Sequence, residues 1–137
     1  MVKKKKPRRM WIWVPPKKPK PKVPNAIKQQ LTEEANQLIE TVLKPKYLEL
    51  PPTDNDFNYI ADIYSRWYRN YFYFIAQYNC PSPEALAPSF ESKYVRLEYV
   101  DENKFNLAYM RYNNQWCETH HERPMMECLN LVKGYLP

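Results

Sequence analysis

Ten of the chain's 21 Lys and Arg residues lie within its first 24 positions, where there is no Asp or Glu. Six Pro residues are interspersed with them, and Pro-rich segments stay extended. Such a segment can neutralise a polyanion, because each phosphate that it pairs releases condensed counterions. We therefore predict an extended basic arm over residues 1–24 that binds the phosphates of RNA or DNA. The binding residues are expected to be Lys3, Lys4, Lys5, Lys6, Arg8, Arg9, Lys17, Lys18, Lys20 and Lys22.

Two Trp residues within the arm add a second kind of chemistry. Trp11 and Trp13 are two positions apart, which places them on one side of an extended chain. Stacking of a base on such a ring contributes about 1–3 kcal/mol. Two other interpretations stay open: residues 11–14 can dock on the body as an edge strand, and the lysines can serve solubility or contact an acidic protein. A membrane surface is disfavoured, because the arm would rely on charge and two Trp without a lipid anchor.

The second group with chemical potential is aromatic. Ten aromatic residues lie between Phe57 and Tyr78, with Arg66 and Arg69 among them. A sheet that displays aromatic rings and Arg can hold single-stranded RNA by stacking. The commoner role, which we favour for most of them, is to fill a core or an oligomer interface. The residues expected to be exposed, Arg66, Trp67, Tyr68 and Arg69, would alternatively form the contact surface of a protein-interaction module.

A third group could bind a metal or act as a nucleophile. Cys117, His120, His121 and Cys128 are close in sequence, but the paired motifs of zinc sites, CxxC and HxxxH, are missing. Cys128 lies next to Leu129, which favours a structural thiol. We predict no metal, no cofactor and no enzyme activity. A metal-dependent enzyme that uses Cys117, His120 and His121 stays as a third alternative.

Glycine content excludes several enzyme classes. Gly134 is the only glycine, whereas phosphate-binding loops and the nucleophile elbow of hydrolases need several. The apolar run at 10–14 is too short for a secretion signal, and no stretch approaches the roughly 20 apolar residues of a membrane span. Three Cys without framework spacing indicate reduced thiols. We expect a cytoplasmic protein.

The elements that must position these residues follow from hydrophobic periodicity. Apolar residues at three- and four-residue steps predict a helix over 25–43, capped by Asn25 and stopped by Pro45. Strands are predicted at 57–64, 71–78, 90–100, 104–112 and 115–120, with turns at 69–70 and 113–114. A short helix opens at Pro124. We predict one α+β domain over 25–137, with an antiparallel sheet of four or five strands between an N-terminal and a C-terminal helix.

The body also resembles known sequences. Residues 94–132 read YVRLEYVDENKFNLAYMRYNNQWCETHHERPMMECLNLV, and they resemble the C-terminal half of a family of small uncharacterised bacterial proteins. Residues 57–74 and 79–94 are similar to the same group, so the resemblance covers about 25–133. The hairpin also resembles, more loosely, the domain of unknown function three-zero-two-four. Cys117 departs from the aromatic residue usual there. The resemblance implies an α+β fold and a bacterial or phage origin, and it implies no activity.

Overall fold

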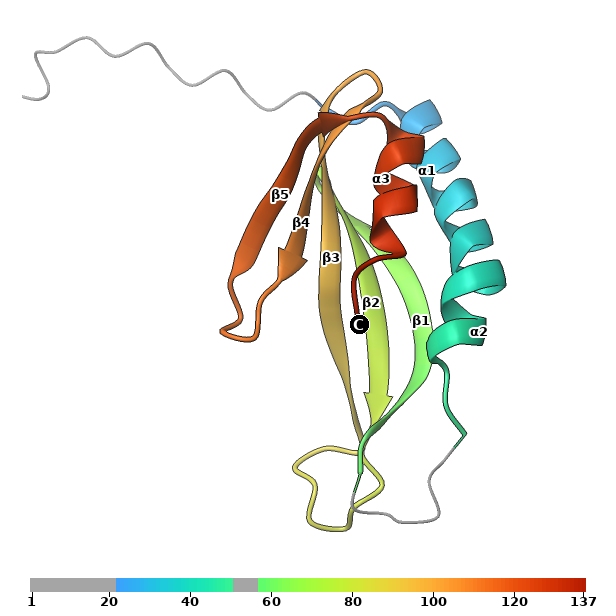
Figure 1. The fold of residues 1–137 in the computed structure, drawn as a ribbon, viewed down its shortest axis with the longest axis vertical. Coiled ribbons are helices and arrows are strands. Elements are labelled where there is room, and N and C mark those ends of the chain that lie inside the picture. The colour runs from blue at the N-terminus through green and yellow to red at the C-terminus, as the bar shows by residue number, and fades with distance from the viewer. Residues whose placement is uncertain (1–21, 51–56) are drawn as a thin grey trace, which may run out of the picture.

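The computed structural model describes residues 22–50 and 57–137. In these residues five strands form one antiparallel sheet in the order β1-β2-β3-β4-β5, with helices before and after it (Figure 1). The strands are β1 (Tyr59–Tyr68), β2 (Tyr71–Asn79), β3 (Ser89–Asp101), β4 (Lys104–Met110) and β5 (Trp116–Arg123). The helical segments are α1 (Asn25–Leu38), η2 (Ile39–Leu43), α2 (Lys44–Tyr47) and α3 (Met125–Val132). The predicted α+β fold is confirmed.

Both ends of the N-terminal helix differ from the prediction. Asn25 is the first helical residue and not the cap, and Pro24 precedes it without a side-chain capping hydrogen bond. The helix also continues past Pro45 to Tyr47 through the π-helical turn η2. Pro lacks an N–H, and its ring collides with the carbonyl four residues earlier. A wider π turn directly before Pro45 relieves that collision, so the helix does not stop there.

The hairpin turns are built without glycine. A two-residue turn joins Tyr68 to Tyr71, and its first residue, Arg69, has a φ of 54°. Asn114, in the β4–β5 turn, has a φ of 62° and donates its backbone N–H to the carbonyl of Arg111 at 2.9 Å. Asn tolerates this left-handed conformation better than most residues. The predicted turns at 69–70 and 113–114 are therefore confirmed.

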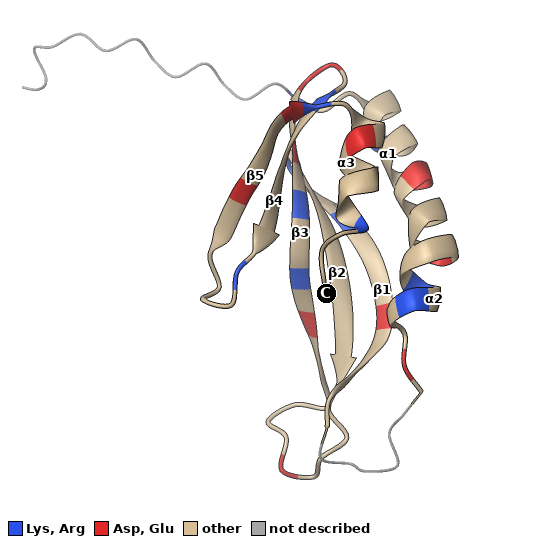
Figure 2. Cartoon of the chain, in the orientation of Figure 1, with Lys and Arg blue, Asp and Glu red and all other residues tan. Residues whose placement is uncertain are grey.

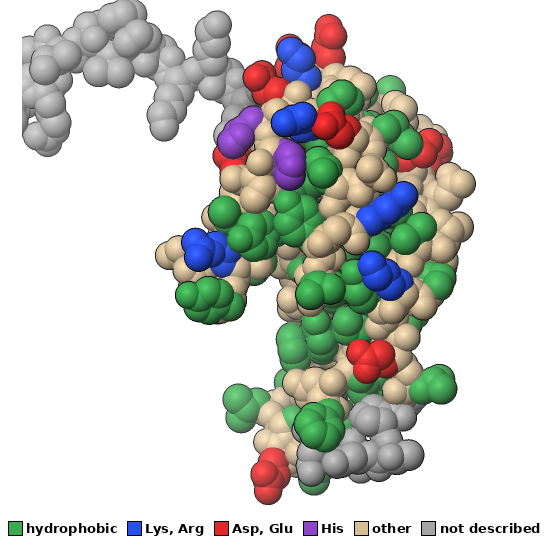
Figure 3. All heavy atoms as spheres, in the orientation of Figure 1, with side chains coloured by type: hydrophobic (Ala, Val, Ile, Leu, Met, Phe, Trp, Pro, Cys, Tyr) green, Lys and Arg blue, Asp and Glu red, His purple; other side chains and the backbone are tan. Residues whose placement is uncertain are grey.

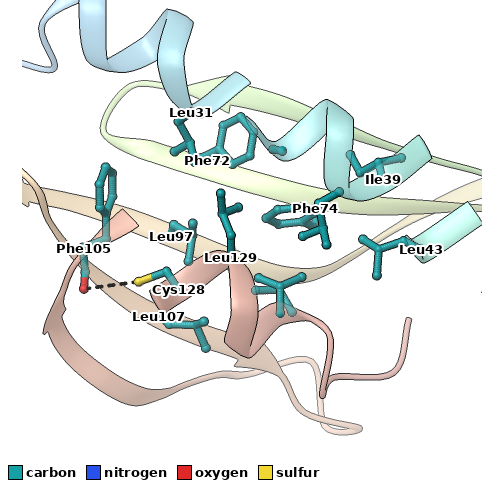
Figure 4. Packing of buried hydrophobic residues seen from close by; sticks show 14 of the residues in the cluster. Leu31, Ile39, Leu43, Phe72, Phe74, Leu97, Phe105, Leu107, Cys128 and Leu129 are labelled. Carbon is teal, nitrogen blue, oxygen red and sulfur yellow. Dashed lines mark hydrogen bonds between the residues drawn. The ribbon is translucent and has the colours of Figure 1, made fainter. Parts of the chain in front are cut away.

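The core lies between one face of the sheet and the helices, with α1 and α3 side by side over it (Figure 1). Figure 4 shows Leu31 of α1 beside Phe72 of β2, and Leu129 of α3 among the strand side chains. Buried residues recur in α3 at intervals of three and four, the spacing of an amphipathic helix. No helix in the described residues is long and apolar enough to cross a membrane.

Candidate functional site

Most of the predicted nucleic-acid site lies outside the described residues. This holds for Lys3, Lys4, Lys5, Lys6, Arg8, Arg9, Trp11, Trp13, Lys17, Lys18 and Lys20. Lys22 is the first described residue and is exposed, whereas Val23 is 3% exposed and belongs to the core. The last cation of the arm is thus followed at once by an anchor in the body. This start of the described chain lies at the end of the sheet that carries the β3–β4 turn (Figure 1).

The sheet has one face that the helices do not cover, here called the helix-free face. Side chains of a strand alternate between the two faces. Phe72 and Phe74 of β2 point into the helix-covered core, so Tyr71, Tyr73 and Ile75 lie on the helix-free face. The register of the neighbouring strands then identifies the other residues of this face.

The four residues expected to be exposed near the first turn divide between the two faces. Arg66 and Tyr68 lie on the helix-free face, opposite Tyr73 and Tyr71 in the register. Arg69 lies in the turn, with its guanidinium carbon 5.2 Å from the ring centroid of Tyr68. Tyr68 is 56% exposed and is available to a partner.

Trp67 differs from its neighbours, because it lies on the helix-covered face. Its indole Nε1 donates to the Thr32 hydroxyl at 3.1 Å and to the Lys28 carbonyl at 3.3 Å, and its ring packs edge-on against Phe72. The residue is half-buried and joins β1 to α1. The prediction that Trp67 is exposed beside Tyr68 is therefore wrong, because strand alternation turns it toward the helix.

Arg66 is held by an acidic neighbour on the same face. Its guanidinium donates to both carboxylate oxygens of Glu91, at 2.8 and 3.3 Å, and the Tyr64 hydroxyl donates to the same carboxylate. The hydrogen bonds from Arg66 and Tyr64 lower the pKa of Glu91. Partial burial and the bond to Glu91 raise the pKa of Tyr64 to about 12. This cluster is saturated internally, so it offers little to an outside ligand.

The middle of the helix-free face holds two further cations that sequence reasoning did not single out. The guanidinium carbon of Arg96 lies 4.7 Å from the ring centroid of Tyr71 and 4.8 Å from that of Trp116. Lys93 places its ammonium 4.7 Å from the ring centroid of Tyr73. Figure 2 shows the basic positions of β3 in blue along the middle of the sheet. We call Lys93, Arg96, Tyr71, Tyr73 and Trp116 the cationic strip.

A β-bulge explains why both cations of β3 share a face. Phe74 pairs with Val95 but Ile75 pairs with Lys93, so Tyr94 is an extra residue in β3. Without the bulge, residues three positions apart would lie on opposite faces. A bulge is not readable from the sequence. The alternation of Tyr71 and Tyr73 was the one available signal for an aromatic strip here.

The cations of the strip lie over a second, smaller apolar layer, to which Tyr73 of the strip itself belongs. Tyr73, Ile75 and Ala108 are 9%, 0% and 1% exposed, although they lie on the helix-free face. The small side chain of Ala108, opposite Arg96 in β4, leaves room for the ring of Trp116 to reach across from β5. Trp116 also contacts Tyr73, with ring centroids 5.8 Å apart. Packing beneath therefore fixes the position of the strip.

The Cys and His residues do not converge on one site. His120 bonds the Thr119 hydroxyl at 3.0 Å, and His121 bonds Glu118 at 3.1 Å. Cys128 is buried, and its Sγ points to the Phe105 carbonyl (Figure 4). The Arg123 carbonyl lies 3.7 Å from the same Sγ. Burial raises the pKa of the Cys128 thiol to about 12, which disfavours the thiolate that a ligand or nucleophile needs.

Cys117, half-buried, pairs with Tyr109 in the sheet. Among residues 22–50 and 57–137, no three His, Cys, Asp or Glu side chains gather in a way that could hold a metal ion.

Two open grooves indent the described surface. One, of about 480 Å³, lies between the continuous α1–η2 segment and α3, and its lining includes Glu34, Thr41 and Lys133. The other, of about 450 Å³, lies at the 80–88 loop beside the exposed Leu86 and Phe90. Figure 3 shows hydrophobic side chains in green at that end of the molecule. The described lining of neither groove includes a His residue.

Comparison with known proteins identifies a family. The family described as Domain of unknown function (DUF3024) matches residues 20–135, which is almost the whole body. The similarity to that family is therefore not limited to the hairpin, because the match includes every described helix and strand. Residues 1–19, with most of the basic arm, lie outside the match. No curated protein and no solved structure matches the chain.

Proposed function

This chain belongs to DUF3024, a family of unknown function, and we propose that it is a small non-enzymatic nucleic-acid-binding protein. Its basic arm grips the phosphates of RNA or DNA without strong sequence specificity. An accessory subunit of a larger nucleoprotein complex is one form that this function can take.

The observation that carries the proposal is the segregation of charge along the chain. Residues 1–24 hold ten basic residues and no acid, whereas the remaining residues hold 11 basic and 15 acidic residues. A net charge of +10 on the arm faces a body of −4. Scattered surface lysines would serve solubility equally well, but a segment that concentrates positive charge and has no acid matches a continuous polyanion.

Two features of the body support this use of the arm. Val23 is packed in the core directly after Lys22, so the arm is attached to the folded body through a core residue. The net charge of the body is negative, so its surface as a whole adds little attraction for a polyanion. The arm would therefore supply most of the affinity, and contacts from the body would be confined to local cationic groups.

A matched pair of triple variants tests the proposal. The first is Lys4→Gln, Lys5→Gln and Lys6→Gln in the arm, and the second is Lys46→Gln, Lys104→Gln and Lys133→Gln at exposed body positions. Both remove three positive charges. Binding to a single-stranded RNA and to a DNA duplex is measured at about 100 mM salt. We expect the arm variant to bind both ligands about tenfold more weakly, and the body variant to bind like the wild type.

Equal binding by the two triple variants would contradict the proposal. Absence of binding by the wild-type chain would favour the protein-interaction alternative, in which Tyr68 is the exposed aromatic contact. Elemental analysis of the purified protein tests the third alternative, a metal-dependent enzyme using Cys117, His120 and His121. Stoichiometric bound metal would support that alternative against ours.

A further inference from the structure

We infer that the cationic strip on the helix-free face is a second nucleic-acid contact, selective for single strands, with Arg96 as its phosphate-binding centre. This inference rests on the proposed function and deepens it. The arm would supply affinity for any polyanion, and the strip would favour strands whose bases are unpaired.

Arg96 is built into the face as a fixed donor group. The rings of Tyr71 and Trp116 lie at 4.7 and 4.8 Å from its guanidinium carbon, and they come from β2 and β5. Contact with two rings restricts the guanidinium, whose planar N–H groups can donate two parallel bonds to one phosphate. Because the rings already restrict the side chain, binding orders it at little further entropic cost.

Lys93 extends the positive charge along β3. It lies on the same face as Arg96 because of the bulge at Tyr94. Three strand residues span roughly 10 Å, so the two cations can contact phosphates of one strand. Lys93 is exposed, and its ammonium lies over the ring of Tyr73.

Two acids lie near the strip, and both have partners elsewhere on the face. Glu91 is bound by Arg66 and Tyr64, although the charge of Lys93 also helps to lower its pKa, and Glu98 accepts a bond from Asn106 at 3.4 Å. Among the ion pairs of the described residues, none involves Lys93 or Arg96. Two cations that form no ion pair with another described residue are complementary to a polyanion, even on a mildly acidic body.

Shape selects a single strand over a duplex. The major groove is about 12 Å wide and admits a helix or a two-stranded ribbon, whereas this face spans five strands. An open sheet instead accepts a strand laid across it, with bases stacked on aromatic side chains. Tyr68 is 56% exposed and is paired with Tyr71 at the edge of the strip, where it can stack with a base.

Four full-length proteins test the inference: the wild type, Lys93→Gln with Arg96→Gln, the arm triple variant, and Arg66→Gln as a control. Arg66 lies on the same face but is already paired with Glu91. The ligands are a single-stranded RNA of about 20 nucleotides, a DNA duplex and poly-glutamate. The double variant is expected to bind RNA about tenfold more weakly and the duplex like the wild type. Arg66→Gln is expected to change neither affinity.

The outcomes separate the inference from the function on which it rests. In one outcome, the arm variant binds both ligands more weakly while the double variant binds RNA like the wild type. That result overturns the inference about the strip and leaves the proposed function of the arm in place. An arm variant without effect overturns the proposed function. Arg96-dependent binding of poly-glutamate as tight as that of RNA overturns the assignment and points to an acidic protein.

A cross-linking measurement on the wild-type chain tests the inference without depending on whether the variants fold. RNA with 4-thiouridine is photocross-linked to the full-length protein, and the modified peptides are mapped. Adducts on Tyr68, Tyr71 or Trp116 are expected. Adducts confined to residues 1–24 would overturn the strip whatever the variants show.

Discussion

Arg96 of β3 stacks on Trp116 of β5 across the intervening strand β4, with 4.8 Å between the guanidinium carbon and the ring centroid. On the helix-free face, the contact links the middle strand of the sheet to the edge strand β5. Ala108, the residue of β4 that pairs with Arg96, has a small side chain that leaves room for this contact. The pair therefore joins the stability of the sheet to the positioning of a candidate phosphate-binding group.

Coupling between these two residues is the first prediction. A double-mutant cycle of Arg96→Gln and Trp116→Leu, measured by urea unfolding, should give a coupling free energy of about 0.5–1 kcal/mol. The control cycle uses Arg111 and Tyr112, which lie at 6.0 Å in the exposed turn and should show almost none. A coupling no larger than the control would mean that the stack is not formed in solution.

Alkaline pH should destabilise the protein through Cys128. The thiol's ordinary pKa is near 9, and burial raises it to about 12 in the folded state. Between these values the unfolded chain releases the proton and the folded chain keeps it, so stability is full below pH 9 and falls above it. Each such group contributes a slope of about 1.4 kcal/mol per pH unit.

The measurement is the free energy of unfolding of the wild type and of Cys128→Ala between pH 9 and 10. This window lies below the ordinary pKa of Tyr64 and Lys44, which also rise on folding. The variant should be less stable at neutral pH, because it loses buried volume, but its stability should fall less steeply with pH. Parallel pH profiles for the two proteins would contradict the assignment to this thiol.

The β4–β5 turn should depend on the residue at position 114. With a φ of 62°, Asn114→Ala should lower stability by about 1 kcal/mol, because a Cβ without a polar group disfavours this conformation. Asn114→Gly should be neutral or slightly stabilising. Thermal unfolding of both variants checks the prediction, and equal effects of Ala and Gly would show that φ is not the cause.

The attachment of α1 to β1 should depend on the hydroxyl of Thr32. Thr32→Val keeps the side-chain shape but removes the acceptor that lies 3.1 Å from the Trp67 indole nitrogen. Since the indole keeps its second acceptor, the Lys28 carbonyl, we expect a loss of about 0.5–1 kcal/mol. Thr41→Val, on the exposed side of the same helix, is the control and should change stability less.

The strands and turns could be predicted because their signals are local. Arg69–Asn70 and Asn113–Asn114 interrupt apolar runs, and the predicted strands follow from them. The continuation of the helix past Pro45 could not be predicted, since the standard rule makes Pro a stop signal and the π turn depends on helix packing.

The candidate site was less accessible to sequence reasoning, for two physical reasons. The face on which Trp67 lies depends on where strand alternation begins, and the sequence leaves both choices open. The meeting of Arg96 with Trp116 depends on a bulge and on contact between strands that are not neighbours. The arm, by contrast, was predicted from charge alone, and its role stays a prediction because most of it lies outside the described residues.

The most direct measurement is the salt dependence of RNA binding for the full chain, compared with a full-length variant in which the nine arm cations from Lys3 to Lys20 are replaced by Gln. For a single strand, the logarithm of the binding constant falls with the logarithm of salt by about 0.7 per phosphate neutralised. If each of the ten arm cations pairs one phosphate, the arm contributes a slope of about −7 in the wild type and near −1 in the variant, which keeps Lys22. The same slope in both proteins would contradict the account, because the arm would then contribute no phosphate contacts.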